Sequence, residues 1–140
     1  MRLTESEAID RFLAARVLRL ATADTHGHPH LIPATFAESG GKLVIAVDHK
    51  PKRHQRLKRL RNIAENSSVC ALVDVYDDDW NRLWWVRVDG EAAMLEDAAA
   101  RAEAADQLAA KYPQYRATRP DGPIIAISVH RWSGWSYTET

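Results

Sequence analysis

The chain has 140 residues, 46% hydrophobic and 27% charged, a composition typical of globular proteins that excludes a disordered chain. Its 19 basic and 19 acidic residues give a formal net charge of zero, so no global field attracts nucleic acid or an anionic membrane. The single cysteine excludes an internal disulfide and a multi-cysteine zinc site. No stretch approaches 18 apolar residues, and the first residues lack the apolar core of a signal peptide. We therefore expect one cytoplasmic domain covering residues 1–140.

The pattern along the chain predicts short strands interrupted by helices. Thr4 and Glu7 form a capping box ahead of apolar residues at helical spacing, which predicts a helix over residues 4–15. Turn residues at 24–27 and 39–41 separate three apolar stretches, and the first two are expected to pair as a hairpin. The expected strands are 17–23, 28–38, 42–48, 69–75, 83–95 and 124–130, and the further expected helices are 49–66 and 96–112. Six short strands with helical caps indicate a mainly β protein built as an antiparallel barrel.

The strongest local signal is the basic segment, residues 49–66. It contains seven Lys or Arg residues and one acid, Glu65, while Leu57, Leu60 and Ile63 recur at helical spacing. Its apolar stripe would dock on the barrel and its cations would face outward. Two interpretations stay open: an ordinary solvated helix face, or an anion site at the strand–helix junction, where helix N–H groups and the helix dipole favour a phosphate. The basic segment is short and no other basic stretch extends it, so it does not indicate a nucleic-acid-binding surface.

Aromatic residues form a second pattern, with five tryptophans in the chain. Trp84 and Trp85 are adjacent on an expected strand, so their side chains must face opposite sides of the sheet. One can fill the core while the other lines a cavity or a subunit interface, although core packing would explain either. Trp132 and Trp135, in the segment after the last expected strand, are harder to explain by core packing and are typical of a cover over a ring-shaped ligand or a partner.

Other signatures of chemistry are weak. His26, His28 and His30 alternate as they would on one face of a strand, but no carboxylate lies at a spacing that would complete a metal site, so we expect none. The sequence contains no nucleophile elbow, no P-loop and no glycine-rich dinucleotide fingerprint. No side chain stands out as a catalytic acid or base.

The order of these segments resembles the pyridoxamine 5′-phosphate oxidase-like split barrels. The resemblance covers nearly the whole chain and is carried by LATA at 20–23, GHPHLIP at 27–33, LVIAVD at 43–48, LRNI at 60–63 and VCALVD at 69–74. Three further stretches, DHKPK at 48–52, YDDDW at 76–80 and LWWVRVDG at 83–90, resemble an actinobacterial subgroup described as probable F420-dependent oxidoreductases. The basic segment is longer than in related proteins by about a helical turn.

The resemblance implies a six-stranded antiparallel split β-barrel of the FMN-binding type. It implies a homodimer with two cofactor clefts, each built from both chains, and hydride transfer between coenzyme F420 and a small electron-poor organic substrate. The alternatives are an FMN-dependent enzyme of the same fold and a non-catalytic cofactor carrier. Few basic residues lie on the early strands, where oxidase-type members bind phosphate, and this favours F420. The implied cofactor-binding residues are Pro33, Ala34 and Thr35 at the ring, Lys50, Lys52, Arg53, Arg56 and Arg59 at the phosphate, and Trp84, Trp85 and Trp135 as walls.

Overall fold

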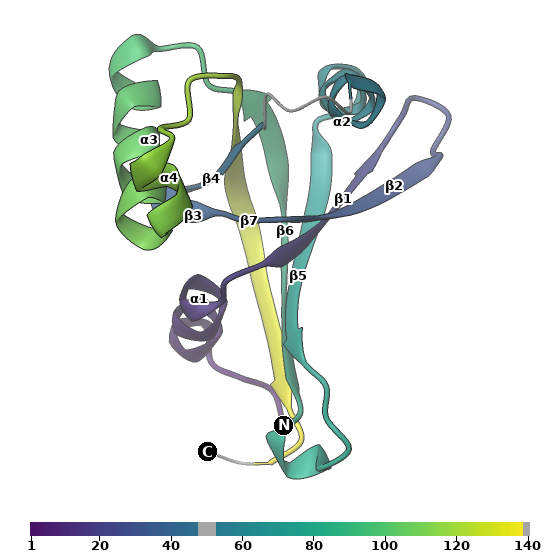
Figure 1. Cartoon of the computed structure of the whole chain (residues 1–140). Helices are drawn as coiled ribbons and strands as arrows, with labels where there is room; N and C mark the ends of the chain where they lie inside the picture. Colours follow the sequence, from purple (N-terminus) through teal and green to yellow (C-terminus); the bar gives the residue numbers. More distant parts are fainter. Residues whose placement is uncertain (48–52, 139–140) are drawn as a thin grey trace.

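The structure is a computed structural model that describes residues 1–47 and 53–138 (Figure 1). The helices are α1 (Glu5–Ala14), α2 (Arg53–Glu65), α3 (Ala98–Lys111) and α4 (Pro113–Ala117), and a 3₁₀ turn, η1, spans Trp80–Arg82. The strands are β1 (Leu18–Ala23), β2 (Pro29–Ala34), β3 (Ala37–Ser39), β4 (Lys42–Ala46), β5 (Ser68–Val75), β6 (Trp84–Met94) and β7 (Ile124–Ser136). Among the described residues, no helix is both long and apolar enough to cross a membrane.

All the strands belong to one antiparallel sheet, in the order β2-β1-β5-β6-β7-β4-β3. The two edge strands, β2 and β3, are separated in the chain by only Thr35 and Phe36. The sheet must therefore curl until its edges approach each other at that corner, while β2 and β3 do not pair with one another. The result is a mainly β, antiparallel split barrel with helices around it (Figure 1).

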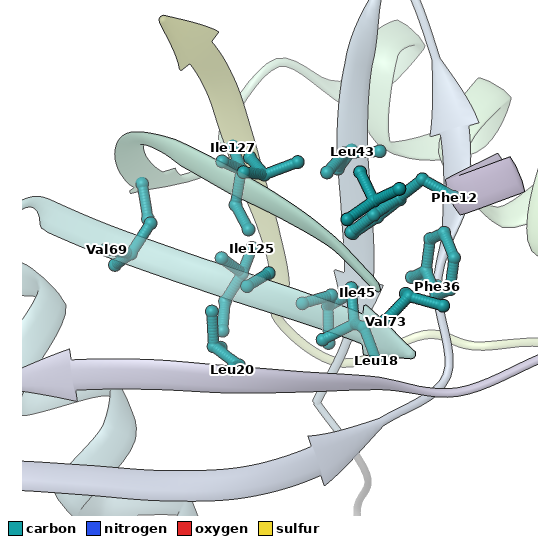
Figure 2. Packing of buried hydrophobic residues seen from close by; sticks show 14 of the residues in the cluster. Phe12, Leu18, Leu20, Phe36, Leu43, Ile45, Val69, Val73, Ile125 and Ile127 are labelled. Atoms are coloured by element: carbon teal, nitrogen blue, oxygen red, sulfur yellow. The ribbon is translucent and has the colours of Figure 1, made fainter. Parts of the chain in front are cut away.

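The hydrophobic core lies inside the curl, where both halves of the sheet contribute to one cluster. Leu20 of β1, Ile45 of β4 and Ile127 of β7 are all buried in it (Figure 2). Helix α1 adds Phe12, whose ring packs edge-on against Phe36 and Trp132 at centroid distances of 5.2 and 5.4 Å. Because this cluster uses the inner face, the outer face of β1, β5 and β6 keeps its side chains for other contacts.

The corner between the edge strands is fixed by two tyrosines. The hydroxyl of Tyr112, at the end of α3, accepts a hydrogen bond from the Phe36 amide at 3.2 Å and lies 2.8 Å from the Arg16 carbonyl oxygen. Tyr115 of α4 pairs its hydroxyl with Thr35 Oγ1 at 2.8 Å. Burial raises the pKa of Tyr112, so its hydroxyl stays protonated and able to donate. These bonds occupy the polar groups that a sharp corner would otherwise leave unpaired.

The part of the chain that the structure describes has seven strands where six were expected. The expected strand over residues 28–38 is interrupted at Thr35 and Phe36, where the chain crosses from β2 to β3. Thr and Phe are strand-forming residues, so the local sequence does not mark this corner, and the break comes from the curl of the whole sheet. The last strand was expected to end at His130 but continues to Ser136. The aromatic segment therefore belongs to β7, and Trp132 packs in the core.

Candidate cofactor-binding site

The basic helix α2 is attached to the sheet through its last turns, where Leu60 packs against the main core. Ile63 is buried in the main core, and buried Asn62 donates a hydrogen bond from Nδ2 to Thr22 Oγ1 of β1 at 3.1 Å. Arg59 precedes these residues by three and four positions and therefore lies on the same side of the helix. Because Ile63 and Asn62 hold this side of α2 against the sheet, Arg59 faces the barrel instead of solvent.

Lys58, Arg59 and His30 form a cationic cluster between α2 and β2, in which Lys58 and Arg59 carry the positive charge. Arg59 Nε and His30 Nδ1 are both buried, and neither has a hydrogen-bond partner in the described part of the chain. Burial lowers the pKa of Arg59, although a guanidinium remains charged at neutral pH. The pKa of His30 is also lowered, first by burial and then by the positive charges of Lys58 and Arg59. Basic groups therefore converge here, and no described carboxylate pairs with Arg59 or His30.

Such a cluster is unfavourable unless something binds to it. Leaving one buried polar group without a partner costs about 1–3 kcal/mol, and more for a charged group. An anionic group of a ligand would accept a charge-assisted hydrogen bond from Arg59, and a further one from His30 in the tautomer that carries the proton on Nδ1. The donors present at Arg59, Lys58 and His30 therefore fit the phosphate of a flavin-type cofactor.

The second group of predicted site residues lies on the outer face of the sheet. Trp85 of β6 and Trp135 of β7 are direct partners in the strand register. Both are half-buried, and both line a hollow of about 350 Å³. Trp85 also lines a neighbouring, largely apolar hollow of about 520 Å³ that extends over β1 and β5 to Leu31. The two tryptophans therefore present aromatic surface on the side of the sheet away from the core.

Trp84 lies on the other side, as the alternation along a strand predicts. It packs against the main core, and the Arg11 guanidinium lies over its ring at 5.3 Å from the centroid. It lines a separate hollow of about 490 Å³ together with residues of α1, β1 and β5. Trp84 and Trp85 thus face opposite sides of the sheet, as expected for adjacent residues of a strand, and each lines a hollow on its own side.

The cationic cluster and the Trp85–Trp135 pair do not meet within one chain. His30 pairs with Thr22, one residue beyond the Ala21–Cys70 pair, whereas Trp85 pairs with Asp74. Along the strand direction, the positions of His30 and Trp85 therefore differ by about five residues of β5, or roughly 17 Å at the rise of an antiparallel strand. In Figure 1, α2 lies at one end of the sheet and the start of β6 at the other. His30 also shares the inner face with Ile32, whereas Trp85 is on the outer face.

The remaining predicted residues have varied positions. Lys50 and Lys52 lie outside the described residues. Arg53 and Arg56 are on the first turns of α2, where the structure describes the backbone only. Pro33 is exposed at the end of β2, while Ala34 and Thr35 are half-buried where β2 meets the corner, with the Thr35 hydroxyl bound to Tyr115. Sequence reasoning did not select His30 as an anion ligand, because its proximity to Arg59 depends on the packing of α2 on the sheet.

Comparison with known proteins agrees with this architecture. Residues 5–136 match the family model described as pyridoxamine 5′-phosphate oxidase. The chain belongs to the pyridoxamine 5′-phosphate oxidase family. No curated protein matches the sequence.

Several solved structures share this fold and align with nearly the whole chain. A conserved hypothetical protein from Mycobacterium tuberculosis has a TM-score of 0.73 at 21% identity, covering 96% of this chain and 85% of its own. An FAD-binding protein from Mesorhizobium loti has a TM-score of 0.69 at 21% identity, with coverage of 96% and 93%. The heme storage protein HutZ from Vibrio cholerae has a TM-score of 0.70 at 19% identity, with coverage of 97% and 95%. At these identities the likeness shows a shared fold.

Proposed function

We propose that this protein is an oxidoreductase that binds coenzyme F420 in a cleft between two copies of the chain and transfers hydride to a small electron-poor organic substrate. The observation that carries the proposal is the pair of buried, unpartnered nitrogens at Arg59 and His30. In this proposal they hold the cofactor phosphate, together with the predicted ligands Arg53 and Arg56 on α2 and Lys50 and Lys52 before it. The bound deazaflavin supplies the hydride chemistry, and the chain binds it, orients it and excludes water.

The dimeric cleft is proposed because the two halves of the site are separated within one chain. A second copy related by two-fold symmetry can bring its own Trp85 and Trp135 to the cluster at Arg59. The outer face supports such pairing, since Leu31, Leu72 and Tyr76 are 66%, 36% and 72% exposed. Their hollow also contains Arg19, Asp74 and Arg87, so opposite charges are available for pairing across the two-fold axis.

The choice of F420 over FMN rests on the basic residues near β1 and on the breadth of the basic helix. Arg16 donates from Nη2 to the Lys111 carbonyl oxygen at 2.8 Å and lies over the Tyr112 ring, so it is engaged within the fold. Arg61, by contrast, is exposed on α2, the helix that carries Arg59. A wide cationic surface suits the anionic oligoglutamate tail of F420 better than the single phosphate of FMN. Because one structural neighbour is an FAD-binding protein, FMN or FAD is the alternative cofactor.

Binding and turnover separate these proposals. We expect saturable quenching of F420 fluorescence at micromolar protein with one site per chain, and oxidation of reduced F420 in the presence of nitroaromatic or quinone acceptors. Tight uptake of FMN with no F420 binding would identify the FMN-dependent enzyme instead. F420 binding without turnover across the acceptor panel would identify a carrier. Failure to bind either cofactor would contradict the proposal.

A further inference from the structure

The hollow of about 350 Å³ beside Trp135 has features that the cofactor proposal does not use. Arg2 and Leu3 line one side of it, within a segment that runs antiparallel to the end of β7. The Leu3 amide donates to the Gly134 carbonyl oxygen at 3.0 Å, and the Ser136 amide donates to the Met1 carbonyl oxygen at 2.8 Å. An isolated bridge pairs Arg2 with Trp135. The backbone therefore holds Arg2 at the hollow.

Three arginines from three different segments line this hollow: Arg2, Arg87 of β6 and Arg131 of β7. Arg87 is paired with Asp89, with 3.2 Å between Nε and Oδ2. For Arg2 and Arg131, the described part of the chain provides no ion pair, and no carboxylate is among the lining residues. Asp89, which is opposite Arg131 in the strand register and pairs with Arg87, neutralises one of the three arginines, so the hollow keeps an excess of positive charge although the whole chain is neutral.

Ser133 provides an independent sign of a missing ligand. It lines the hollow directly opposite Arg87 in the strand register. Its Oγ is buried and has no hydrogen-bond partner in the part of the chain that the structure describes. Buried hydroxyls are nearly always paired, because an unpaired one costs about 1–3 kcal/mol. A bound acceptor would remove this cost.

We infer that this hollow binds the substrate of the proposed reaction, and that the substrate is a planar organic acid. Its ring stacks on the indoles of Trp85 and Trp135, and its carboxylate binds the guanidinium groups of Arg2 and Arg131 and accepts a hydrogen bond from Ser133. Arginine matches a carboxylate with two parallel hydrogen bonds, and aromatic faces bind flat rings with little loss of side-chain freedom. The inference rests on the proposed function for the role of this acid as hydride acceptor, but the binding itself needs no cofactor.

Calorimetry on the cofactor-free protein tests the inference with 4-nitrobenzoate and nitrobenzene, which differ by the carboxylate. We expect wild type to bind 4-nitrobenzoate at least about tenfold more tightly, the effect of one charge-assisted pair. Arg131→Met and Arg2→Met should remove this preference, whereas Arg119→Met, an exposed arginine paired with Asp106, should keep it. Trp135→Leu should weaken both ligands alike.

Two outcomes would overturn the inference: equal affinities of wild type for both compounds, or a preference that persists in Arg131→Met. A preference that disappears only in Arg59→Met would place the acid at the α2 cluster and would also overturn it. Because these titrations contain no cofactor, they are separate from the F420 test. Retained F420 binding without the acid preference rejects only this inference, and the reverse result rejects only the proposed function.

Discussion

Replacing Gly90 with alanine is expected to destabilise the fold by about 3 kcal/mol or more, a large part of the stability of an ordinary domain. Gly90 is buried in β6 at the point where the β6–β7 register shifts. A Cβ added there would overlap the Ser128 carbonyl oxygen and lie 3.2 Å from Ile127 Cγ2. Both strands are fixed by pairing on either side, so the backbone has little room to move. Denaturant unfolding of the purified variant measures the effect.

Gly134→Ala is the matched control on the opposing strand. The nearest atom to its added Cβ is Leu3 Cδ1 at 2.9 Å, the end of a flexible side chain that can change rotamer. We expect a loss of about 1 kcal/mol, within the ordinary range for a tolerated core substitution. If Gly90→Ala unfolds at the same denaturant concentration as wild type, β7 is not packed on β6 as described.

Arg59→Met is expected to raise the dissociation constant for F420 by about ten- to a hundredfold, because charge-assisted bonds to phosphate contribute about 1.5–3 kcal/mol. Methionine keeps most of the apolar stem of the arginine side chain. Removing a half-buried guanidinium whose Nε is buried without a partner should leave the melting temperature unchanged or slightly higher. Fluorescence titration and a thermal melt measure the two quantities on the same sample.

Arg61→Met controls for the general charge of the helix. Arg61 is exposed on α2, two residues after Arg59, so its loss changes the net charge equally. We expect its F420 dissociation constant to stay within about twofold of wild type, as for a screened surface charge. An equal loss of affinity in both variants would mean that α2 acts only as a diffuse basic surface.

The sequence predicts the elements of this fold well where the signal is local. The capping box at Thr4 and Glu7 forms as expected, with both reciprocal hydrogen bonds present. The opposite faces of Trp84 and Trp85 follow from strand geometry alone. The corner at Thr35 and Phe36 could not be predicted, because nothing in those residues opposes a continuous strand. Helix α4 was also missed, since it is a short helix beginning at Pro113 within a loop-like sequence.

The candidate site was predictable only in part, because packing between elements and not local sequence brings its residues together. Charge clustering identifies the basic segment, but the sequence does not distinguish Arg59 from its neighbours. That distinction needs the packing of Asn62 and Ile63, which turns Arg59 toward His30. The arginine-lined hollow gave no sequence signal, because Arg2, Arg87 and Arg131 are far apart in the chain and come together only through strand pairing.

A heterodimer of two defective chains tests the central claim, a cofactor cleft shared between two copies. One chain carries Arg59→Glu, the other carries Trp85→Ala and Trp135→Ala, and two different affinity tags isolate the mixed dimer. We predict that neither variant alone binds F420 at concentrations saturating for wild type. The mixed dimer should bind with wild-type affinity at half the wild-type stoichiometry, because one of its two clefts contains only intact residues. A mixed dimer without any wild-type site, or chains that remain monomeric, would contradict the shared cleft.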